Sequence, residues 1–394
     1  MNLKKKLAMV FCAALLVLAM AGCGSDGAKQ AKQETKADGK GAITFTDLEN
    51  RNVKLDKVPQ KIVVGDYLLN YLAIGGAKSL DKVVGMTMDG WEDVRYGESQ
   101  VFSAAFPKLK KGNPDRIPSI GGYHNNVLNI EKILSLKPDV LLIDKTQFRE
   151  NNQNINLLEK AGIKVVVLDY HAETVENHTK STEILGRLLG RESVAKEQND
   201  AYKKAFDLVD KRVAALPAAK KNRKVFMEIG NKGAGEMGNS YRNILWGSMI
   251  TRAGGKNLGD TLKGTYGVLD QEYVTSQNPD VIIIGGSIWA KDTKGDQMRM
   301  GFTVPEDLAQ KRLAGFAAKP EWQNLNAIKN GEVYGVDHGS LRTMVDYTFL
   351  EYIAKILYPE AFKDVDPIKE MNDFYAKYLP EVKYTGTFMI HLKR

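Results

Sequence analysis

The chain has 394 residues, of which 43% are hydrophobic and 26% are charged, with a formal charge of +8. This length suits two compact domains, and two cysteines exclude both a disulfide scaffold and a cysteine-rich metal protein. Roughly half of the net charge lies before residue 42, so the folded part is too mildly basic to indicate nucleic-acid binding, whereas an anionic small ligand remains open.

Residues 1–22 have the pattern of a secretory signal peptide. Lys4, Lys5 and Lys6 precede an uncharged apolar run over residues 7–21, which is shorter than the roughly 20 residues needed to span a bilayer. A single membrane-anchoring helix is the alternative interpretation. Residues 19–23 resemble the bacterial lipobox, with Met20 at the position where leucine is usual. This resemblance implies that Cys23 carries lipid such as palmitate and becomes the mature N-terminus.

Residues 23–41 are predicted to form a flexible tether behind that lipidated cysteine. The segment after Cys23 is polar and rich in glycine and lysine, and such a composition cannot bury enough apolar surface to fold. The N-terminal segments together predict an exported protein. It would be anchored by lipid to the cell membrane and would face the periplasm or the cell exterior.

Short aliphatic runs then alternate with helical segments, which is typical of an α/β fold with a largely parallel sheet. Residues 43–46 and 52–55 predict a small hairpin. The expected strands cover residues 61–64, 83–86, 140–143 and 165–168 in the first half, and 224–227, 281–284 and 332–336 in the second. Residues 88–118 and 286–304 lack clear periodicity and are expected to be long loops.

One long helix is predicted between the two sets of strands, over residues 192–216. Gly190 precedes it, Pro217 follows it, and apolar residues recur along one face at Tyr202, Ala205, Val209, Val213 and Leu216. We therefore expect an N-terminal lobe over 42–190, a connecting helix over 191–217 and a C-terminal lobe over 218–394. The predicted fold class is α/β.

An internal repeat supports two related lobes. Residues 131–143 and 272–284 each place a glutamate, Glu131 or Glu272, seven residues before a Pro-Asp pair and an aliphatic strand. Proline ends a helix, and the strand that follows accounts for the rest of the pattern. The recurring glutamate also has a purely structural explanation, because acidic residues favour helix starts.

The order of these features over residues 42–380 resembles the solute-binding proteins of bacterial ABC importers, in the ferric-siderophore, haem and vitamin B12 class. The residues that carry the resemblance are the lipobox, 61–64, 119–122 before 129–131, both Pro-Asp strands, the 192–216 helix and 322–334. It implies two doubly wound α/β lobes joined by one long helix, with the ligand cleft between the lobes and limited hinge closure. It also implies that Glu131 and Glu272 dock on arginines of the permease.

The loops that follow the strands are where a doubly wound sheet binds ligands. Aromatic rings and arginines there suit a large, flat or anionic ligand, although core packing explains each ring and a solvated surface charge explains each arginine equally simply. Arg342 is the strongest arginine candidate, because the family places cleft residues after that strand. The candidates are Tyr67, Trp91, Tyr123, His124, Tyr241, Arg242, Tyr266, Trp289, Arg299, His338 and Arg342.

Several functions stay open at this point. A bare-metal carrier needs a cluster of histidine and carboxylate ligands, but His124 and His338 alone fall in the predicted cleft loops, so no metal site is assigned. Haem would need an axial ligand such as Tyr67 or Tyr123, and a corrinoid would use the aromatic loops. No hydrolase or nucleotide-binding motif is present, and a sensor or adhesin without transport is a further alternative.

The sequence thus favours a monomeric, non-catalytic lipoprotein with no cofactor of its own. It would capture a ferric siderophore, an Fe(III) chelate, and deliver it to an ABC permease and its ATPase, with haem or a corrinoid as the alternative ligand.

Overall fold

The computed structural model describes residues 41–394 except 90, 123–124 and 290–294. The stretch Gly39–Arg394 forms one compact unit. The expected signal peptide, Cys23, Tyr123 and His124 lie outside the described residues. No helix in the described part of the chain is long and apolar enough to cross a membrane.

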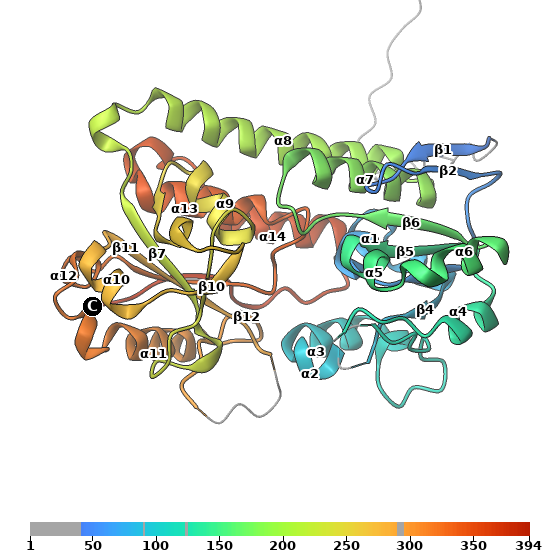
Figure 1. Cartoon of the computed structure of the whole chain (residues 1–394), viewed down its shortest axis with the longest axis horizontal. Helices are drawn as coiled ribbons and strands as arrows, with labels where there is room; N and C mark the ends of the chain where they lie inside the picture. Colours follow the sequence, from blue (N-terminus) through green and yellow to red (C-terminus); the bar gives the residue numbers. More distant parts are fainter. Residues whose placement is uncertain (1–40, 90, 123–124, 290–294) are drawn as a thin grey trace, which may run out of the picture. The chain divides into compact units, whose positions relative to one another are not determined.

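The first lobe is built on a parallel sheet with strand order β4-β3-β5-β6 (Figure 1). Its strands are almost wholly buried and aliphatic, as expected for a sheet covered on both faces. The strands are β3 (Ile62–Val64), β4 (Val83–Met86), β5 (Val140–Asp144) and β6 (Lys164–Leu168), beside the antiparallel hairpin β1 (Ile43–Thr46) and β2 (Asn52–Leu55). The helices are α1 (Leu68–Gly75), α2 (Trp91–Val94), α3 (Tyr96–Ala105), α4 (Ile130–Leu136), α5 (Lys145–Glu150), α6 (Asn152–Lys160) and α7 (Val175–Leu189).

The second lobe repeats this plan with strand order β15-β13-β11-β7-β9, in which β15 alone of the strands in this sheet runs antiparallel to its neighbour. The sheet strands are β7 (Lys224–Ile229), β9 (Lys256–Asn257), β11 (Val281–Gly286), β13 (Val333–Asp337) and β15 (Met389–His391). Two antiparallel ribbons pair β8 (Asn239–Tyr241) with β10 (Tyr266–Val268) and β12 (Gly301–Phe302) with β14 (Gly386–Thr387). The helices are α9 (Leu245–Arg252), α10 (Gln271–Gln277), α11 (Glu306–Ala317), α12 (Asn326–Asn330), α13 (Tyr347–Leu357) and α14 (Pro367–Tyr378).

The long helix α8 (Glu192–Ala215) packs on α7 of the first lobe and on α13 of the second (Figure 1). Tyr202, Ala205 and Val209 form its buried face, as the sequence predicted. One hydrophobic cluster runs from the first sheet through this face to Trp246 and Phe349 in the second lobe. A shared core of this kind resists bending between the lobes, because bending would expose apolar surface. The fold class predicted from the sequence is therefore confirmed.

The internal repeat also has a clear structural basis. Both short helices, α4 and α10, end on a residue in the left-handed conformation, Lys137 or Asn278, directly before the Pro-Asp pair. The aspartate then reaches the neighbouring strand: Asp139 Oδ2 accepts from Lys61 N at 2.9 Å, and Asp280 Oδ2 accepts from Lys224 N at 2.9 Å. Each Pro-Asp therefore fixes the start of two adjacent parallel strands.

The expectation of a featureless loop over 88–118 is wrong. The segment forms α2, α3 and a 3-10 turn at Pro107–Leu109. The sequence of α3 is weakly helical, with Gly97, Ser99 and Ser103 inside it. Packing stabilises it instead, because Phe102 is fully buried and its ring meets the Phe302 ring edge-on at 6.1 Å. The other expected loop, 286–304, contains the two-residue strand β12.

Candidate ligand-binding site

The strand orders place one topological switch point in each lobe. In the first lobe the chain order reverses between β3 and β5, and in the second between β7 and β11. Ligands of doubly wound sheets bind in the crevice beyond the carboxyl ends of such strands. Both crevices are therefore candidate sites, and their contents differ.

The crevice of the first lobe is lined by carboxyl groups. Asp66 follows β3 and Asp144 ends β5. The two strands approach closely at Gly65, where a Cβ atom would lie 2.7 Å from the carbonyl oxygen of Leu142, so glycine is required here. Burial and the neighbouring Asp144 raise the pKa of Asp66 to about 8. At neutral pH the Asp66 carboxyl group therefore keeps its proton.

The crevice of the second lobe is filled by the protein itself. Met298 donates its backbone N–H to Gly230 O at 2.8 Å, and its own carbonyl accepts from Ser287 N at 3.4 Å. The side chains of Met298 and Met300 are fully buried beside Gly286, where an added Cβ would lie 2.7 Å from Met298 Cγ. These buried side chains occupy the region beside the two strand ends.

A cavity of about 240 Å³ opens at the first switch point. Its floor comes from the first lobe and includes Asp66, Tyr67, Trp91, Asp144 and His171, and its roof is the second-lobe segment 339–343 with Arg342. A larger groove of about 1290 Å³ lies elsewhere, among α11, α14, β14 and β15. We favour the smaller cavity, because it combines residues of both lobes at the carboxyl ends of parallel strands.

The roof segment is hydrogen-bonded to the first lobe. The buried side chain of Asn70 donates to Arg342 O at 2.9 Å and accepts from Met344 N at 3.0 Å. Glu173 Oε1 accepts from Arg342 N at 3.1 Å. These bonds hold Arg342 in a left-handed backbone conformation with a φ of 66°, which a non-glycine residue adopts only when its surroundings enforce it.

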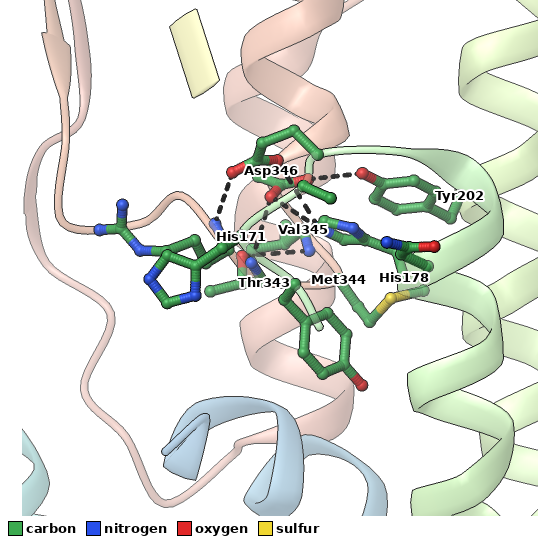
Figure 2. A network of polar contacts seen from close by, with 12 residues as sticks. His171, His178, Tyr202, Thr343, Met344, Val345 and Asp346 are labelled. Carbon is green, nitrogen blue, oxygen red and sulfur yellow. Dashed lines mark hydrogen bonds and ion pairs between the residues drawn. The ribbon is translucent and has the colours of Figure 1, made fainter. Parts of the chain in front are cut away.

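A second set of bonds ties the same segment to the helices behind it (Figure 2). Asp346 accepts from Thr343 N at 3.1 Å and from the Tyr202 hydroxyl on α8 at 3.0 Å. It also lies 3.2 Å from His178 Nε2 on α7, whose ring is stacked on Tyr202. The position of the roof is therefore coupled to the connecting helix through buried polar contacts.

The electrostatics of the cavity combine opposite charges. Two arginines, Arg342 and Arg95, line it together with the carboxyl groups of Asp66, Asp144 and Glu98. Burial raises the pKa of Glu98, and burial together with the charge of Arg95 lowers the pKa of Arg342.

His171 is an exposed residue that lines the cavity. The atoms packed around its ring and the charges of Arg342 and Arg95 lower its pKa to about 3, so the ring is neutral at physiological pH. Its Nδ1 lies 2.6 Å from the Tyr67 hydroxyl.

Three of the candidates from the sequence line this cavity: Tyr67, Trp91 and Arg342. A second group gathers nearby in the second lobe, where His338 stacks on Tyr241 at 5.9 Å and Tyr241 lies 6.3 Å from the exposed ring of Tyr266. The cavity lining does not include these rings, nor does it include Arg242, Trp289 or Arg299. Their role in binding stays a prediction.

The sequence reasoning missed Asn70, Asp144, His171 and Glu173. These residues include side chains at the ends of the strands predicted at 140–143 and 165–168, where a doubly wound sheet also binds ligands. Asp144 is the last residue of β5, and His171 and Glu173 follow β6. The same rule would therefore have found these three. Asn70 lies in the first turn of α1, and no pattern in the sequence around it indicates its bonds to the roof segment.

Comparison with known proteins places this geometry in a family. Residues 103–338, more than half of the chain, match the family model described as periplasmic binding protein. The chain belongs to this family. The proteins of the family bind solutes and are not enzymes, and this member is the substrate-binding protein of an ABC importer.

Individual relatives agree with this assignment along nearly the whole chain. The crystal structure of the TroA-like periplasmic binding protein FepB from Veillonella parvula superposes with a TM-score of 0.82 at 32% identity, covering 89% of this chain and all of that one. The uncharacterized ABC transporter substrate-binding lipoprotein YvrC of Bacillus subtilis is 27% identical, covering 91% of this chain and all of YvrC. The iron(3+)-hydroxamate-binding protein FhuD of the same organism is 28% identical, covering 85% of this chain and 91% of FhuD.

The two glutamates of the repeat occupy equivalent places in this family fold. Glu131 is the second residue of α4 and Glu272 the second residue of α10, and both are exposed. Each helix is capped by the residue before it, Asn129 or Asp270, whose side chain accepts from a backbone N–H three residues on. Each lobe thus presents one exposed carboxylate at the start of the short helix that precedes its Pro-Asp pair.

Proposed function

We propose that the protein is a monomeric, lipid-anchored receptor outside the cytoplasm that captures a compact anionic iron(III) chelate and passes it to an ABC permease and its ATPase. The observation that carries the proposal is the cavity at the first switch point, with Arg342 above a floor of aromatic and carboxyl side chains. The iron is cargo, and the protein needs no cofactor of its own to hold it. The iron(3+)-hydroxamate relative supports this ligand class.

The size of the cavity favours a compact chelate over the alternatives. Pockets for drug-sized ligands occupy about 300–1,000 Å³. At about 240 Å³ the cavity lies below that range, so a haem or corrinoid macrocycle would require the lobes to separate and the roof bonds to break. A guanidinium fork binds carboxylate, hydroxamate or catecholate oxygens in bidentate fashion, which suits Arg342 to the anionic face of a small chelate.

A fluorescence titration tests this function. The chain from Gly24 onward keeps the whole compact unit and leaves out the lipidated cysteine. Trp91 belongs to the cavity floor, so ferric hydroxamate, ferric catecholate, ferric citrate, hemin and cyanocobalamin can be compared by quenching of its emission. Saturable quenching by one iron chelate, lost in Trp91→Phe, is the expected result. Saturation by hemin or cyanocobalamin alone would replace the proposal with the alternative ligand, and no saturable response would overturn it.

We also propose that Glu131 and Glu272 dock on basic residues of the permease. Their exposure and their equivalent positions at the two helix starts support a pair of contacts, one for each lobe. The charge reversals Glu131→Lys and Glu272→Lys should leave chelate affinity intact and abolish uptake by whole cells, whereas Glu176→Lys, an exposed change on α7, should leave uptake intact. Normal uptake by both charge reversals would show that docking uses another surface.

The lipid anchor is proposed for Cys23. Cys23→Ser should release the protein from the membrane and abolish incorporation of labelled palmitate. Labelling that persists in this variant would refute the assignment.

A further inference from the structure

Three groups on the cavity floor lie close enough together to bind one metal ion. A carboxylate oxygen of Asp66, a carboxylate oxygen of Asp144 and an imidazole nitrogen of His171 all lie within 4.8 Å of one another. All three residues line the cavity beneath Arg342. They come from the ends of β3 and β5 and from the loop after β6, so the folded sheet brings them together.

Local bonds hold each of these side chains in place. Asp66 Oδ1 accepts from Tyr67 N at 2.7 Å, and Asp144 Oδ1 accepts from Gln147 N at 2.7 Å as the cap of α5. Each aspartate therefore has one oxygen fixed by backbone. The ring of His171 is fixed by its 2.6 Å contact with the Tyr67 hydroxyl, and Tyr67 itself adopts a left-handed backbone at the start of α1. Such outer contacts orient metal ligands in known sites.

The chemistry of the three donors suits a first-row transition metal. Carboxylate and imidazole ligands bind iron, cobalt, nickel and zinc, and three protein ligands on one side leave further coordination positions for other donors. The roof offers the opposite charge, because Arg342 faces the same cavity. The floor therefore suits the metal of a chelate and the roof suits its anionic part.

A second cluster gives a useful contrast. Glu173, His178 and Asp346 are also within ligand distance of one another. Their side chains have no contact with solvent, and they hold the Arg342 and Thr343 backbone and the Tyr202 hydroxyl. That cluster is part of the structural network behind the cavity and does not line it.

We propose that Asp66, Asp144 and His171 coordinate the metal of the cargo directly, so that the preferred ligand is a metal chelate with open coordination positions. This inference rests on the proposed function of carrying an iron chelate. Under this inference the protein supplies the missing ligands of the metal. It therefore recognises the metal itself as well as the outer surface of the chelator. A chelate whose own donors fill all six positions offers the three residues nothing to bind.

Two ferric probes distinguish these possibilities. Iron(III) iminodiacetate, prepared with one chelator per iron, has three chelator donors and leaves three positions open, whereas a hexadentate trihydroxamate leaves none. The chain from Gly24 is dialysed against each probe and bound iron is measured. The variants are Asp66→Asn, Asp144→Asn and His171→Gln, and Asn keeps the oxygen that caps α5. Glu176→Gln, an exposed change outside the cavity, is the control, and thermal unfolding verifies that each variant is folded.

The expected result is a loss of at least tenfold in affinity for iron(III) iminodiacetate in each of the three variants. The control should bind as the unchanged protein does, and affinity for the hexadentate chelate should change less than threefold in every variant. Unaltered binding of iminodiacetate iron by the folded variants would overturn the inference, as would equal losses for both probes. If the unchanged protein binds the hexadentate chelate alone, direct coordination fails while the carrier function stands. If it binds no iron chelate, the proposed function fails and the inference fails with it.

Discussion

Replacement of Asn70 by leucine should weaken both the fold and ligand binding, because this one side chain holds the cavity roof. Leucine has a similar volume but removes the bonds to Arg342 O and Met344 N, and it leaves these two backbone groups without that partner. A buried group that loses its partner costs about 1–3 kcal/mol, so the two together should lower the free energy of unfolding by about 2–6 kcal/mol.

Urea unfolding followed by tryptophan fluorescence measures this loss. With an m-value of about 3 kcal/mol/M, the midpoint should fall by roughly 1 M. Gln198→Met is the matched control, because it also removes a buried amide but loses a single bond, from Nε2 to Ala73 O at 2.9 Å, which does not involve the roof. We expect the control to shift the midpoint by less than half as much.

Ligand affinity distinguishes a role in the roof from general stability. Loss of the Asn70 bonds frees Arg342 from its strained left-handed conformation, so affinity for an anionic iron chelate should fall about tenfold in Asn70→Leu and stay unchanged in Gln198→Met. Equal stability losses in the two variants would refute the reasoning about the pair of bonds. Unchanged affinity in Asn70→Leu would show that the roof does not depend on Asn70.

Three further predictions can be tested with other substitutions. Arg342→Ala should weaken an anionic chelate by about 1–3 kcal/mol in isothermal titration, and equal affinity would remove the guanidinium from the site. Lys319→Met leaves the buried carboxylate of Glu228 without its cation at 3.0 Å and should cost about 3–5 kcal/mol in urea unfolding. Adding Glu228→Gln should recover part of that loss, and no recovery would contradict the pairing. Burial and Glu370 raise the pKa of Glu351 to about 8 from an unfolded value of 4.5, so the folded state holds a proton that the unfolded state releases. Stability should therefore fall as pH rises from about 5 to 8, and Glu351→Gln should flatten that fall, whereas an unchanged slope would refute it.

The framework of the fold was predictable because its signals are local. The aliphatic runs 140–143 and 281–284 become buried parallel strands, and the apolar face of 192–216 becomes the buried face of α8. Each of these patterns is set by side chains within one element. The Pro-Asp repeat was equally visible in the sequence. Its aspartates accept hydrogen bonds from the backbone N–H groups of Lys61 and Lys224, at the start of the neighbouring strands, rather than from their own turn.

Elements that depend on distant contacts were not predictable. The two-residue strands β9, β12 and β14 exist through pairing with partners far along the chain, such as Gly301 with Thr387. The helix α3 has a sequence that disfavours helix and forms because Phe102 has a buried place to pack. Intrinsic helix propensity is a weak guide to structure where tertiary packing determines whether a segment is helical.

The site was predictable only in part, and for the same reason. Position after a strand identifies Tyr67 and Arg342, and the same rule applied to every strand would have added Asp144 and His171. The roof contacts of Asn70 join residues more than 270 positions apart, so no local pattern could show them.

Under the proposed carrier function, the methionine-filled crevice of the second lobe predicts the stoichiometry of binding. Two lobes of like topology would offer two equivalent crevices, but Met298 and Met300 make one of them part of the hydrophobic core. The protein should therefore saturate at one chelate per chain, held off-centre against the first lobe. Each encounter with the permease would then transfer a single iron, and the second lobe would serve to cover the cargo and to report its presence.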